Sequence, residues 1–452
     1  MNVVSLPYLG LAGFACLFLM FTDRIKRRYT VFLCNAVFLV LLRANLRDWL
    51  YVLVLSGYVY LAGRMLAGKR SRGLTLILCL IPVLGLVFYK YAGHFLGDRI
   101  LMPLGLSFYT FKAVSYLAEI GKGKLKSRDF LSVFDYLVFF PAFMAGPIHR
   151  PKEFFTELRK TGTFDYTDRK NGCIQAGFGL AEKMLIADEL SALVPKLFAA
   201  SSASGVYALL GIIVYSFRIY TDFDSYSNIA IGTARMMGFH LEPNFRTPYL
   251  AATLKEFWNR WHISLSTWLR DYVYIPLGGS RKGTLRRYLN IIIVFLVSGI
   301  WHGSTAMFVI WGLGHGILRC VEEAIIGRRE IPKALRPLFI VLNFVLVSIL
   351  WVFFRSATVS EALSILSSVR FAPFVDGSAA EIGINEWHWM FVLIGIVIAT
   401  DLLRSRKDMI VWLSERPFPL RWAVYAAVMV LVIIFGVYGP GYDPADFIYV
   451  TF

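Results

Sequence analysis

Three of the seven histidines in this chain of 452 residues lie in short segments rich in tryptophan and glycine. The segments are Trp261-His262, Trp301-His302-Gly303 and Trp311-Gly312-Leu313-Gly314-His315-Gly316. Imidazole has an unperturbed pKa of about 6.5, so a histidine can accept or donate a proton at neutral pH. These three side chains are therefore the first candidates for general acid–base chemistry.

His302 has the most informative surroundings. It follows the apolar run Ile291–Val297 and precedes the apolar run Ala306–Trp311. An ionisable side chain at such a depth is costly and is a functional-site hypothesis by default. Burial would favour the neutral imidazole, which is the form that a general base needs. A lone histidine in a helix bundle can also be a hydrogen-bonded strut between helices, so both interpretations stay open on these residues alone.

His262 and His315 are less distinctive. We expect His262 in the wall of a polar cavity and His315 in a structural role. His302 and His315 are 13 residues apart, which places them about 220° apart around one uninterrupted helix. They can share a face only if the chain breaks at Gly303.

Other chemistries find little support in the residue pattern. A zinc site on a helix needs histidines at i and i+4 with a carboxylate nearby, and no such spacing occurs. No Gly-x-Ser-x-Gly segment indicates a serine hydrolase. The five cysteines form no Cys-x-x-Cys pair, so neither a zinc cage nor a disulfide framework is indicated. A channel or transporter stays open, because Arg260, Arg270 and Asp271 could line a conducting pathway.

The segments that carry these residues must be positioned by membrane helices. Of all residues, 57% are hydrophobic and 17% charged, with a mean hydropathy of +0.59. Soluble domains are roughly half apolar and a quarter charged. A spanning helix needs about 20 mostly apolar residues, and continuous runs favour helices over the alternation of a membrane β-barrel. We therefore expect an all-α polytopic membrane protein of about 11 to 13 embedded helices, with residues 1–452 as a single integral membrane domain.

Apolar segments suited to embedded helices recur along the chain, with no internal repeat, low-complexity linker or soluble domain between them. They are residues 4–22, 29–45, 49–66, 73–91, 101–119, 131–148, 206–221, 289–301, 304–326, 335–355, 387–404 and 420–438. The stretch 222–239 is apolar enough to be embedded as well.

The formal net charge of +17 is concentrated in short loops. Those after the first, third and fifth apolar segments carry clusters of Lys and Arg, and the second and fourth are less basic. By the positive-inside rule the basic loops are cytoplasmic, and the N-terminus faces outward. Topology explains this charge better than nucleic-acid binding does. The N-terminus lacks the features of a cleaved secretory signal, so we expect its first apolar stretch to be a retained anchor.

Two segments interrupt the apolar pattern. Residues 149–190 mix charges with an amphipathic pattern, so we expect them along the membrane interface. Residues 242–288 are rich in Trp, Arg and His, and they contain Pro243, Pro248 and Pro276. Non-helical or polar backbone at membrane depth is tolerated only where protein or a water-filled cavity surrounds it. We therefore expect a reaction chamber in this second segment.

Six longer motifs follow one another along the chain. They are Pro103–Phe111, Phe140–Ile148, Tyr220–Ser227, Glu256–Gly279, the pair Trp301–Gly303 and Trp311–Gly316, and the ending Phe447–Phe452. In content and order they resemble the membrane-bound O-acyltransferase superfamily, and within it the bacterial branch of alginate O-acetylation proteins and their D-alanyl-transfer relatives. The resemblance covers about residues 101–326, with 1–100 and 327–452 as flanking transmembrane helices, and returns at the C-terminus.

The resemblance implies helices wrapped around a central funnel that crosses or nearly crosses the bilayer. It implies that His302 is the essential histidine and His262 a supporting one. Acyl groups, usually as thioesters, would enter from the cytoplasm, and the acceptor hydroxyl would approach from the other side. One departure is that Asp224 follows Phe223 where relatives usually carry Gly and Ser, which leaves the roles of Asp222 and Asp224 open.

On this basis we expect an O-acyltransferase of the bacterial cytoplasmic membrane, namely an O-acetyltransferase for an exported polysaccharide. Acetyl-CoA or another acyl thioester would be the donor, with no tightly bound cofactor, no metal and no nucleic-acid partner. No extracytoplasmic catalytic domain is evident on this chain, so separate extracytoplasmic acetyltransferase or carrier subunits are expected as partners. D-alanyl transfer toward teichoic acid and transport of a small anion are the alternatives.

Acyl transfer from a thioester to a hydroxyl needs a base, donors for the developing oxyanion and exclusion of water. His302 is the expected base, and His262 would hydrogen-bond the acyl carbonyl or polarise the acceptor. Tryptophans would wall the chamber or pack the bundle; they are Trp258, Trp261, Trp268, Trp301 and Trp311.

Charged residues are expected at the edges of this chamber. Arg260 and Arg270 would attract an anionic donor, because phosphates favour guanidinium forks. The basic residues within 281–287 would do the same at the cytoplasmic mouth, or would serve only as a positive-inside signal. Asp222 and Asp224 are expected to form structural ion pairs rather than to act in catalysis, with Arg270 or a histidine as a candidate partner.

Overall fold

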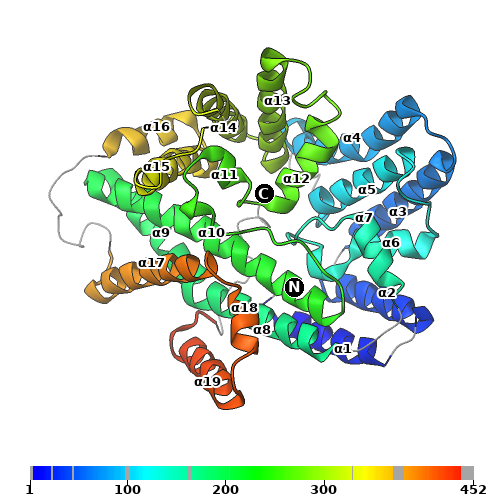
Figure 1. The fold of residues 1–452 in the computed structure, drawn as a ribbon, viewed down its shortest axis with the longest axis horizontal. Coiled ribbons are helices and arrows are strands. Elements are labelled where there is room, and N and C mark those ends of the chain that lie inside the picture. The colour runs from blue at the N-terminus through cyan, green and yellow to red at the C-terminus, as the bar shows by residue number, and fades with distance from the viewer. Residues whose placement is uncertain are drawn as a thin grey trace. The chain divides into compact units, whose positions relative to one another are not determined.

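The computed structural model describes residues 4–21, 24–42, 45–96, 102–160, 165–202, 204–327, 329–369 and 381–438. These residues form α-helices joined by loops and short 3₁₀ or π-helical turns, with no strand among them (Figure 1). They divide into two compact units. The first comprises the described residues up to Phe178 together with Tyr226–Pro243, and the second comprises Gly179–Ser225 and the described residues from Asn244 onward.

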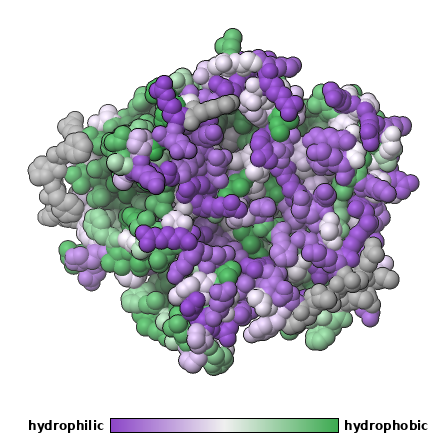
Figure 2. Space-filling model, viewed as in Figure 1, coloured by the Kyte–Doolittle hydropathy of each residue, from purple (hydrophilic) through white to green (hydrophobic). Residues whose placement is uncertain are grey.

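Within the described residues, seven helices are long and apolar enough to span a membrane. They are α3 (Leu46–Leu66), α4 (Arg72–Leu96), α10 (Gly205–Met236), α13 (Thr284–His302), α15 (Arg336–Arg355), α17 (Ile384–Arg404) and α19 (Phe418–Phe435). Hydrophobic side chains gather on the surface over α15, α17 and α19 (green in Figure 2), and α19 buries none of its residues. The protein is thus an all-α, multi-pass membrane protein, as predicted.

The remaining predicted segments correspond to shorter or more polar helices. Residues 4–22, 29–45, 101–119 and 304–326 correspond to α1 (Leu6–Met20), α2 (Arg24–Leu41), α5 (Leu106–Gly121) and α14 (Ala306–Ile325). Fourteen of the sixteen residues of α5 are buried within the protein, so its apolar character reflects a protein core. The segments 206–221 and 222–239 are largely joined in the single long helix α10.

The predicted span 131–148 is wrong as a continuous helix. The chain forms α6 (Phe130–Val138) and then a 3₁₀ turn, η1 (Phe140–Ala142). Phe139 between them has φ −34° and ψ 102°, which is not helical. Pro141 favours this break, because in a continuous helix it would have no N–H to donate to the carbonyl of Leu137 and its ring would clash with that carbonyl. Nine residues reach only about 14 Å along a helix, too short to cross a bilayer.

The two atypical segments each combine α-helices with short 3₁₀ or π-helical turns. The first contains α7 (Pro151–Leu158), α8 (Tyr166–Glu182), a π-helical turn η2 (Lys183–Ala187) and the start of α9 (Asp188–Ala199), which η3 (Ala200–Ser202) follows. The second contains η4 (Pro248–Leu250), α11 (Leu254–Trp258), α12 (Ile263–Leu269) and a π-helical turn η5 (Arg270–Tyr274). The interfacial position of the first segment stays a prediction.

Two short helices complete the second unit, α16 (Val359–Ser368) and α18 (Met409–Ser414). The C-terminal motif 447–452 lies outside the described residues. The boundaries between the two compact units fall within α8 and within α10. That residues 1–452 form a single integral membrane domain therefore stays a prediction.

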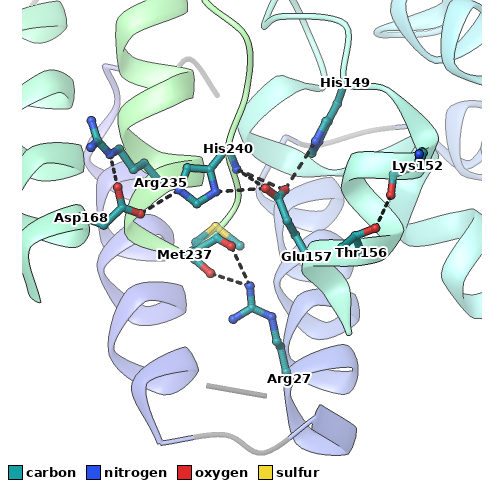
Figure 3. Close-up of polar contacts among 10 residues, drawn as sticks. Arg27, His149, Lys152, Thr156, Glu157, Asp168, Arg235, Met237 and His240 are labelled. Carbon is teal, nitrogen blue, oxygen red and sulfur yellow. Dashed lines mark hydrogen bonds and ion pairs between the residues drawn. The ribbon is translucent and has the colours of Figure 1, made fainter. Parts of the chain in front are cut away.

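A cluster of ionisable side chains joins three segments of the first unit (Figure 3). His240, in the loop after α10, lies between Glu157 of α7 and Asp168 of α8. Its Nδ1 is 3.0 Å from Glu157 Oε1, and its Nε2 is 3.0 Å from Asp168 Oδ2. Arg235 also donates to Asp168, and His149 Nε2 lies 3.6 Å from Glu157. Since both ring nitrogens of His240 face carboxylate oxygens, the imidazolium ion satisfies both of them.

The charge on His240 makes this cluster sensitive to pH. The hydrogen bond with Glu157 is the main cause that raises the pKa of His240, and the charge of Asp168 adds to it. A raised folded-state pKa gives stabilisation that is complete below the unfolded value of about 6.5 and is lost as pH rises through the folded-state value.

We therefore predict that His240→Gln lowers the melting temperature most below about pH 6.5, with a difference that shrinks at higher pH. Thermal unfolding of the purified protein between about pH 5.5 and 9 measures it. His388→Gln, which removes an exposed histidine of α17, is the control. A difference that stays constant over this range would contradict the ion-pair assignment.

Candidate active site

The helices α13 and α14 form a hairpin with a very close contact between their backbones. A Cβ atom at Gly299 would lie 2.3 Å from the carbonyl oxygen of Phe308, and one at Gly312 would lie 2.4 Å from that of Phe295. Small residues allow membrane helices to approach in this way. The three-residue connection includes Gly303, where a side chain would overlap the Phe308 ring. Glycines thus set the distance between the two helices.

This hairpin encloses His302 in aromatic rings. His302 is the last residue of α13 and is 4% exposed. Its ring centroid lies 4.7 Å from that of Trp301, 5.0 Å from Trp311 and 5.3 Å from Phe354 of α15. The Trp311 and Phe354 rings meet it edge to face, at 88° and 74°. The predicted setting of a buried histidine among tryptophans is therefore present.

His262 approaches the same group of rings from the segment between α11 and α12. It is fully buried, and its ring lies 6.1 Å from Trp301 and 4.8 Å from Phe223 of α10. Burial lowers the pKa of His262 to about 3, so the ring is neutral at physiological pH. Its backbone has φ 43° and ψ 51°, a left-handed conformation that is uncommon outside glycine and often marks functional sites.

The loop around His262 is fixed by hydrogen bonds to the loop that contains Asn244 and Arg246. Ile263 N–H donates to the carbonyl of Asn244 at 2.9 Å, and Ser264 Oγ donates to Asn244 Oδ1 at 2.6 Å. Arg246 N–H donates to the carbonyl of Arg260 at 3.0 Å. These bonds hold the left-handed turn in place and so orient the His262 ring.

His315 lies closer to His302 than one continuous helix would allow. The α13 helix ends at His302 and α14 begins at Ala306, so the break that the spacing required does occur at Gly303. The rings of His302 and His315 each lie 5.0 Å from the ring of Trp311. Trp258 Nε1 donates a hydrogen bond to His315 Nδ1 at 3.3 Å. The structure therefore brings His315, which the sequence assigned to a structural role, into the same group of rings.

The predicted tryptophans lie at different places around this group. Trp258 contacts both Trp311 and His315, with ring centroids 5.9 and 5.0 Å away. Trp261 is buried against Trp351 of α15 at 5.0 Å. We use the name aromatic box for the rings that surround His302 and His315, namely Trp258, Trp301, Trp311, Trp351 and Phe354. Trp268 instead lies against Tyr272, at 5.1 Å.

Arg260 and Arg270 have different surroundings. Arg260 donates to Glu256 at 2.6 Å and to Thr247 Oγ1 at 3.1 Å, which ties it to its own loop. Arg270 begins the π-helical turn η5 and pairs with the adjacent Asp271 at 2.8 Å. The Arg270 side chain is 59% exposed, so its guanidinium is accessible to an incoming anion.

Asp222 and Asp224 form ion pairs, as predicted. Asp222 Oδ1 accepts a hydrogen bond from the buried Lys183 at 2.7 Å, and the same ammonium lies 2.7 Å from Asp188. Asp224 pairs with Arg404 of α17 at 2.6 Å. Removing one member of a buried pair typically destabilises a protein by about 3–5 kcal/mol, because the other charge is left uncompensated.

These pairs position one face of the site. Phe223, between the two carboxylates in sequence, packs edge to face on His262 at 89°. The partners are Lys183 and Arg404, rather than the Arg270 that the sequence suggested. Lys183 was missed, although a lysine directly before the apolar run Met184–Ala187 is the kind of intramembrane charge that signals a partner.

Within the described ranges from residue 4 to 438, no group of three His, Cys, Asp or Glu side chains could hold a metal ion. The five cysteines are all free thiols. The polar groups that lie around His302 and His315 are imidazoles and indoles.

Apart from Arg404, the residues of this site lie within a family domain. The sequence profile of the MBOAT, membrane-bound O-acyltransferase family, matches residues 74–364, which is more than half of the chain. The chain belongs to this family. The match includes the α13–α14 hairpin, His262 and the ion pair between Lys183 and Asp222, so these features belong to the family domain.

Curated proteins of several activities are similar to this chain. Probable alginate O-acetylase AlgI of Pseudomonas aeruginosa is 40% identical over 270 residues, which is 59% of this chain and 51% of that protein. Peptidoglycan O-acetyltransferase of Helicobacter pylori is 33% identical over 342 residues, 66% of this chain and 64% of that protein. Teichoic acid D-alanyltransferase of Streptococcus thermophilus is 29% identical over 330 residues, 68% and 79% respectively. The aligned part spans about half the length of the alginate O-acetylases.

The contact between α13 and α14 gives a direct test of the site's construction. Gly299→Ala places a methyl group against the Phe308 carbonyl, so the helices must separate and Trp311 must move away from His302. We predict destabilisation of about 1–3 kcal/mol, measured as a lower melting temperature.

Gly395→Ala, on α17, is the matched control, because a Cβ atom at this position would have no neighbouring heavy atom within 4 Å. It should be neutral or stabilise by up to about 1 kcal/mol. Equal melting temperatures for Gly299→Ala and the wild type would show that the close contact does not hold the hairpin.

Proposed function

We propose that this protein transfers an acyl group, namely acetyl, from a thioester to a hydroxyl of an exported polysaccharide or of a partner acetyltransferase. The observation that carries the proposal is His302, buried among Trp301, Trp311 and Phe354 within the part of the chain that matches the family. The names of the similar alginate and peptidoglycan O-acetylating proteins support a polysaccharide acceptor.

In this mechanism His302 is the general base. Its neutral ring takes the proton of the acceptor hydroxyl while the hydroxyl oxygen attacks the thioester carbonyl carbon. The C–S bond then breaks, and the leaving thiolate takes the proton from the imidazolium. The products are an ester and a free thiol. A positioned base of this kind contributes about 10²–10⁴-fold in rate.

Trp301, Trp311 and Phe354 supply the third requirement, the exclusion of water around His302. Trp301 and Trp311 cover two sides of the His302 ring, and Phe354 covers another. Water would compete with the acceptor hydroxyl for the same thioester, so a dry site favours transfer over hydrolysis.

His262 is proposed to act on the acceptor. Its ring lies next to Trp301, is neutral, and is held by a constrained backbone turn. A neutral imidazole can donate one hydrogen bond and accept another, so it can orient a hydroxyl toward His302. This role leaves the acyl carbonyl to other donors.

The donor is proposed to enter beside the basic loop between η5 and α13. Arg281 and Lys282 are exposed in this loop, and the exposed Arg286 follows in the first turn of α13. With the exposed Arg270 they offer several cations to the phosphates of a carrier such as CoA. We place the loop on the cytoplasmic side of the bacterial inner membrane, with the N-terminus outside, on the positive-inside argument. Separate extracytoplasmic subunits would then receive or deliver the acceptor.

D-alanyl transfer is the second candidate, because the similar teichoic acid D-alanyltransferase is covered over 79% of its length. The two activities differ in donor. The purified chain in lipid nanodiscs can be given labelled acetyl-CoA or a D-alanyl-loaded carrier protein, with alginate, peptidoglycan fragments or lipoteichoic acid as acceptor. Labelled ester from acetyl-CoA supports the first candidate, and ester only from the carrier protein supports the second.

His302→Ala should abolish transfer, with a loss of about 10²–10⁴-fold, while the protein remains folded and inserted. The measurement is labelled ester formed in nanodiscs and in cells. His388→Ala, which removes an exposed histidine of α17, should keep wild-type activity. Wild-type ester formation by the His302 variant would reject the assignment, and substrate flux without any ester would instead indicate a transporter.

His262→Ala should impair transfer more mildly than His302→Ala, because His262 orients the acceptor and does not take its proton. The expected change is a higher KM for the acceptor with a smaller loss of kcat. Activity equal to the wild type would remove His262 from the site.

A further inference from the structure

Two N–H groups in the aromatic box have no acceptor among the described residues. They belong to Trp311 Nε1 and His315 Nε2, and both side chains are fully buried. Buried polar groups are nearly always hydrogen-bonded, so two such groups side by side require an explanation. Their rings lie 5.0 Å apart, and the Trp311 ring also meets the His302 ring edge to face.

The tautomer of His315 follows from its other nitrogen. Nδ1 accepts a hydrogen bond from Trp258 Nε1 at 3.3 Å, so it carries no hydrogen. A charged imidazolium would place one N–H against another at this contact, and the surrounding rings would not solvate it. The neutral ring therefore carries its hydrogen on Nε2, and Trp258 fixes His315 as a donor in that direction.

We propose that Trp311 Nε1–H and His315 Nε2–H donate hydrogen bonds to the carbonyl oxygen of the acyl group as it becomes an oxyanion. This inference rests on the proposed acyl transfer and supplies its second requirement, the oxyanion donors. Preorganised donors in a water-excluded site stabilise such a charge far more than they would in water. In the free protein these donors lack an acceptor because their acceptor is the substrate.

The arrangement also gives each histidine a separate task. His302 removes the proton from the acceptor hydroxyl, whose oxygen attacks the carbonyl carbon. The carbonyl oxygen gains the negative charge and is held by Trp311 and His315. When the tetrahedral intermediate collapses, the C=O bond reforms, the C–S bond breaks, and the thiolate takes the proton from His302. His262 orients the acceptor throughout.

Trp351 provides a matched control inside the same aromatic box. It stacks on Trp311 at 5.7 Å with an interplanar angle of 20°, so its size and surroundings are similar. Its Nε1 donates to the hydroxyl of Tyr249 at 3.2 Å and is therefore already engaged. Trp351→Phe removes as much indole as Trp311→Phe but removes no free donor.

The experiment measures kcat and KM for acetyl-CoA with the full chain in nanodiscs. The acceptor is whichever of alginate, peptidoglycan fragments or lipoteichoic acid gives labelled ester with the wild type. Trp311→Phe and His315→Leu should each lower kcat on the order of 10²–10³-fold, with KM for acetyl-CoA changed less than about threefold. His315→Gln should recover much of the loss, because an amide can accept from Trp258 and still donate. Trp351→Phe should keep kcat within about threefold of the wild type.

The outcomes separate this inference from the proposed function. If His302→Ala abolishes transfer but Trp311→Phe and His315→Leu keep kcat, the donors are wrong and the acyltransferase assignment stands. The inference is rejected if Trp351→Phe lowers kcat as much as Trp311→Phe does. It is also rejected if Trp311→Phe, His315→Leu and Trp351→Phe lower the melting temperature equally, because the aromatic box would then have a structural role only. If the wild type forms no ester from any donor, the proposed function fails first.

Discussion

The close contact between α13 and α14 is the constraint on which the candidate site depends. Gly299 and Gly312 lie where any side chain would meet the carbonyl oxygens of Phe308 and Phe295. Because the backbones approach this closely, the last residue of one helix and the second turn of the next face each other. His302 and Trp311 meet for that reason, and their contact in turn places His315 beside them.

Around this hairpin the buried ion pairs and the rings that surround His302 are formed by different residues. The buried ammonium of Lys183 is shared by two carboxylates, and Arg404 takes Asp224, so the ions near Phe223 are paired. The rings around His302 are apolar or neutral. An unpaired charge buried beside His302 would be costly to desolvate and would change the electrostatic field around the oxyanion that forms during the reaction. The charges near Phe223 are paired, so they hold the helices together without leaving an uncompensated ion.

The sequence predicted a large part of the site from residue types and their order. His302, His262, Trp258, Trp301 and Trp311 lie together, and the two aspartates form ion pairs, as expected. It did not predict Lys183 or Arg404 as partners, because nothing in linear order joins η2 or α17 to that turn of α10. It also mistook 131–148 for a span, because hydropathy cannot distinguish a lipid-facing residue from one buried in protein.

Composition alone therefore determined the class of this protein, since only lipid can accept so much apolar surface with so few charges. Motif order pointed to its family, and the apolar runs around His302 marked the histidine to examine. Tertiary structure decided what that histidine meets. The helix ends at His302, and because of this break His302 and His315 both contact the indole of Trp311. On one uninterrupted helix their 13-residue spacing would place them about 220° apart around the axis. Helix ends and backbone contacts depend on packing between distant segments, which no local pattern in the sequence contains.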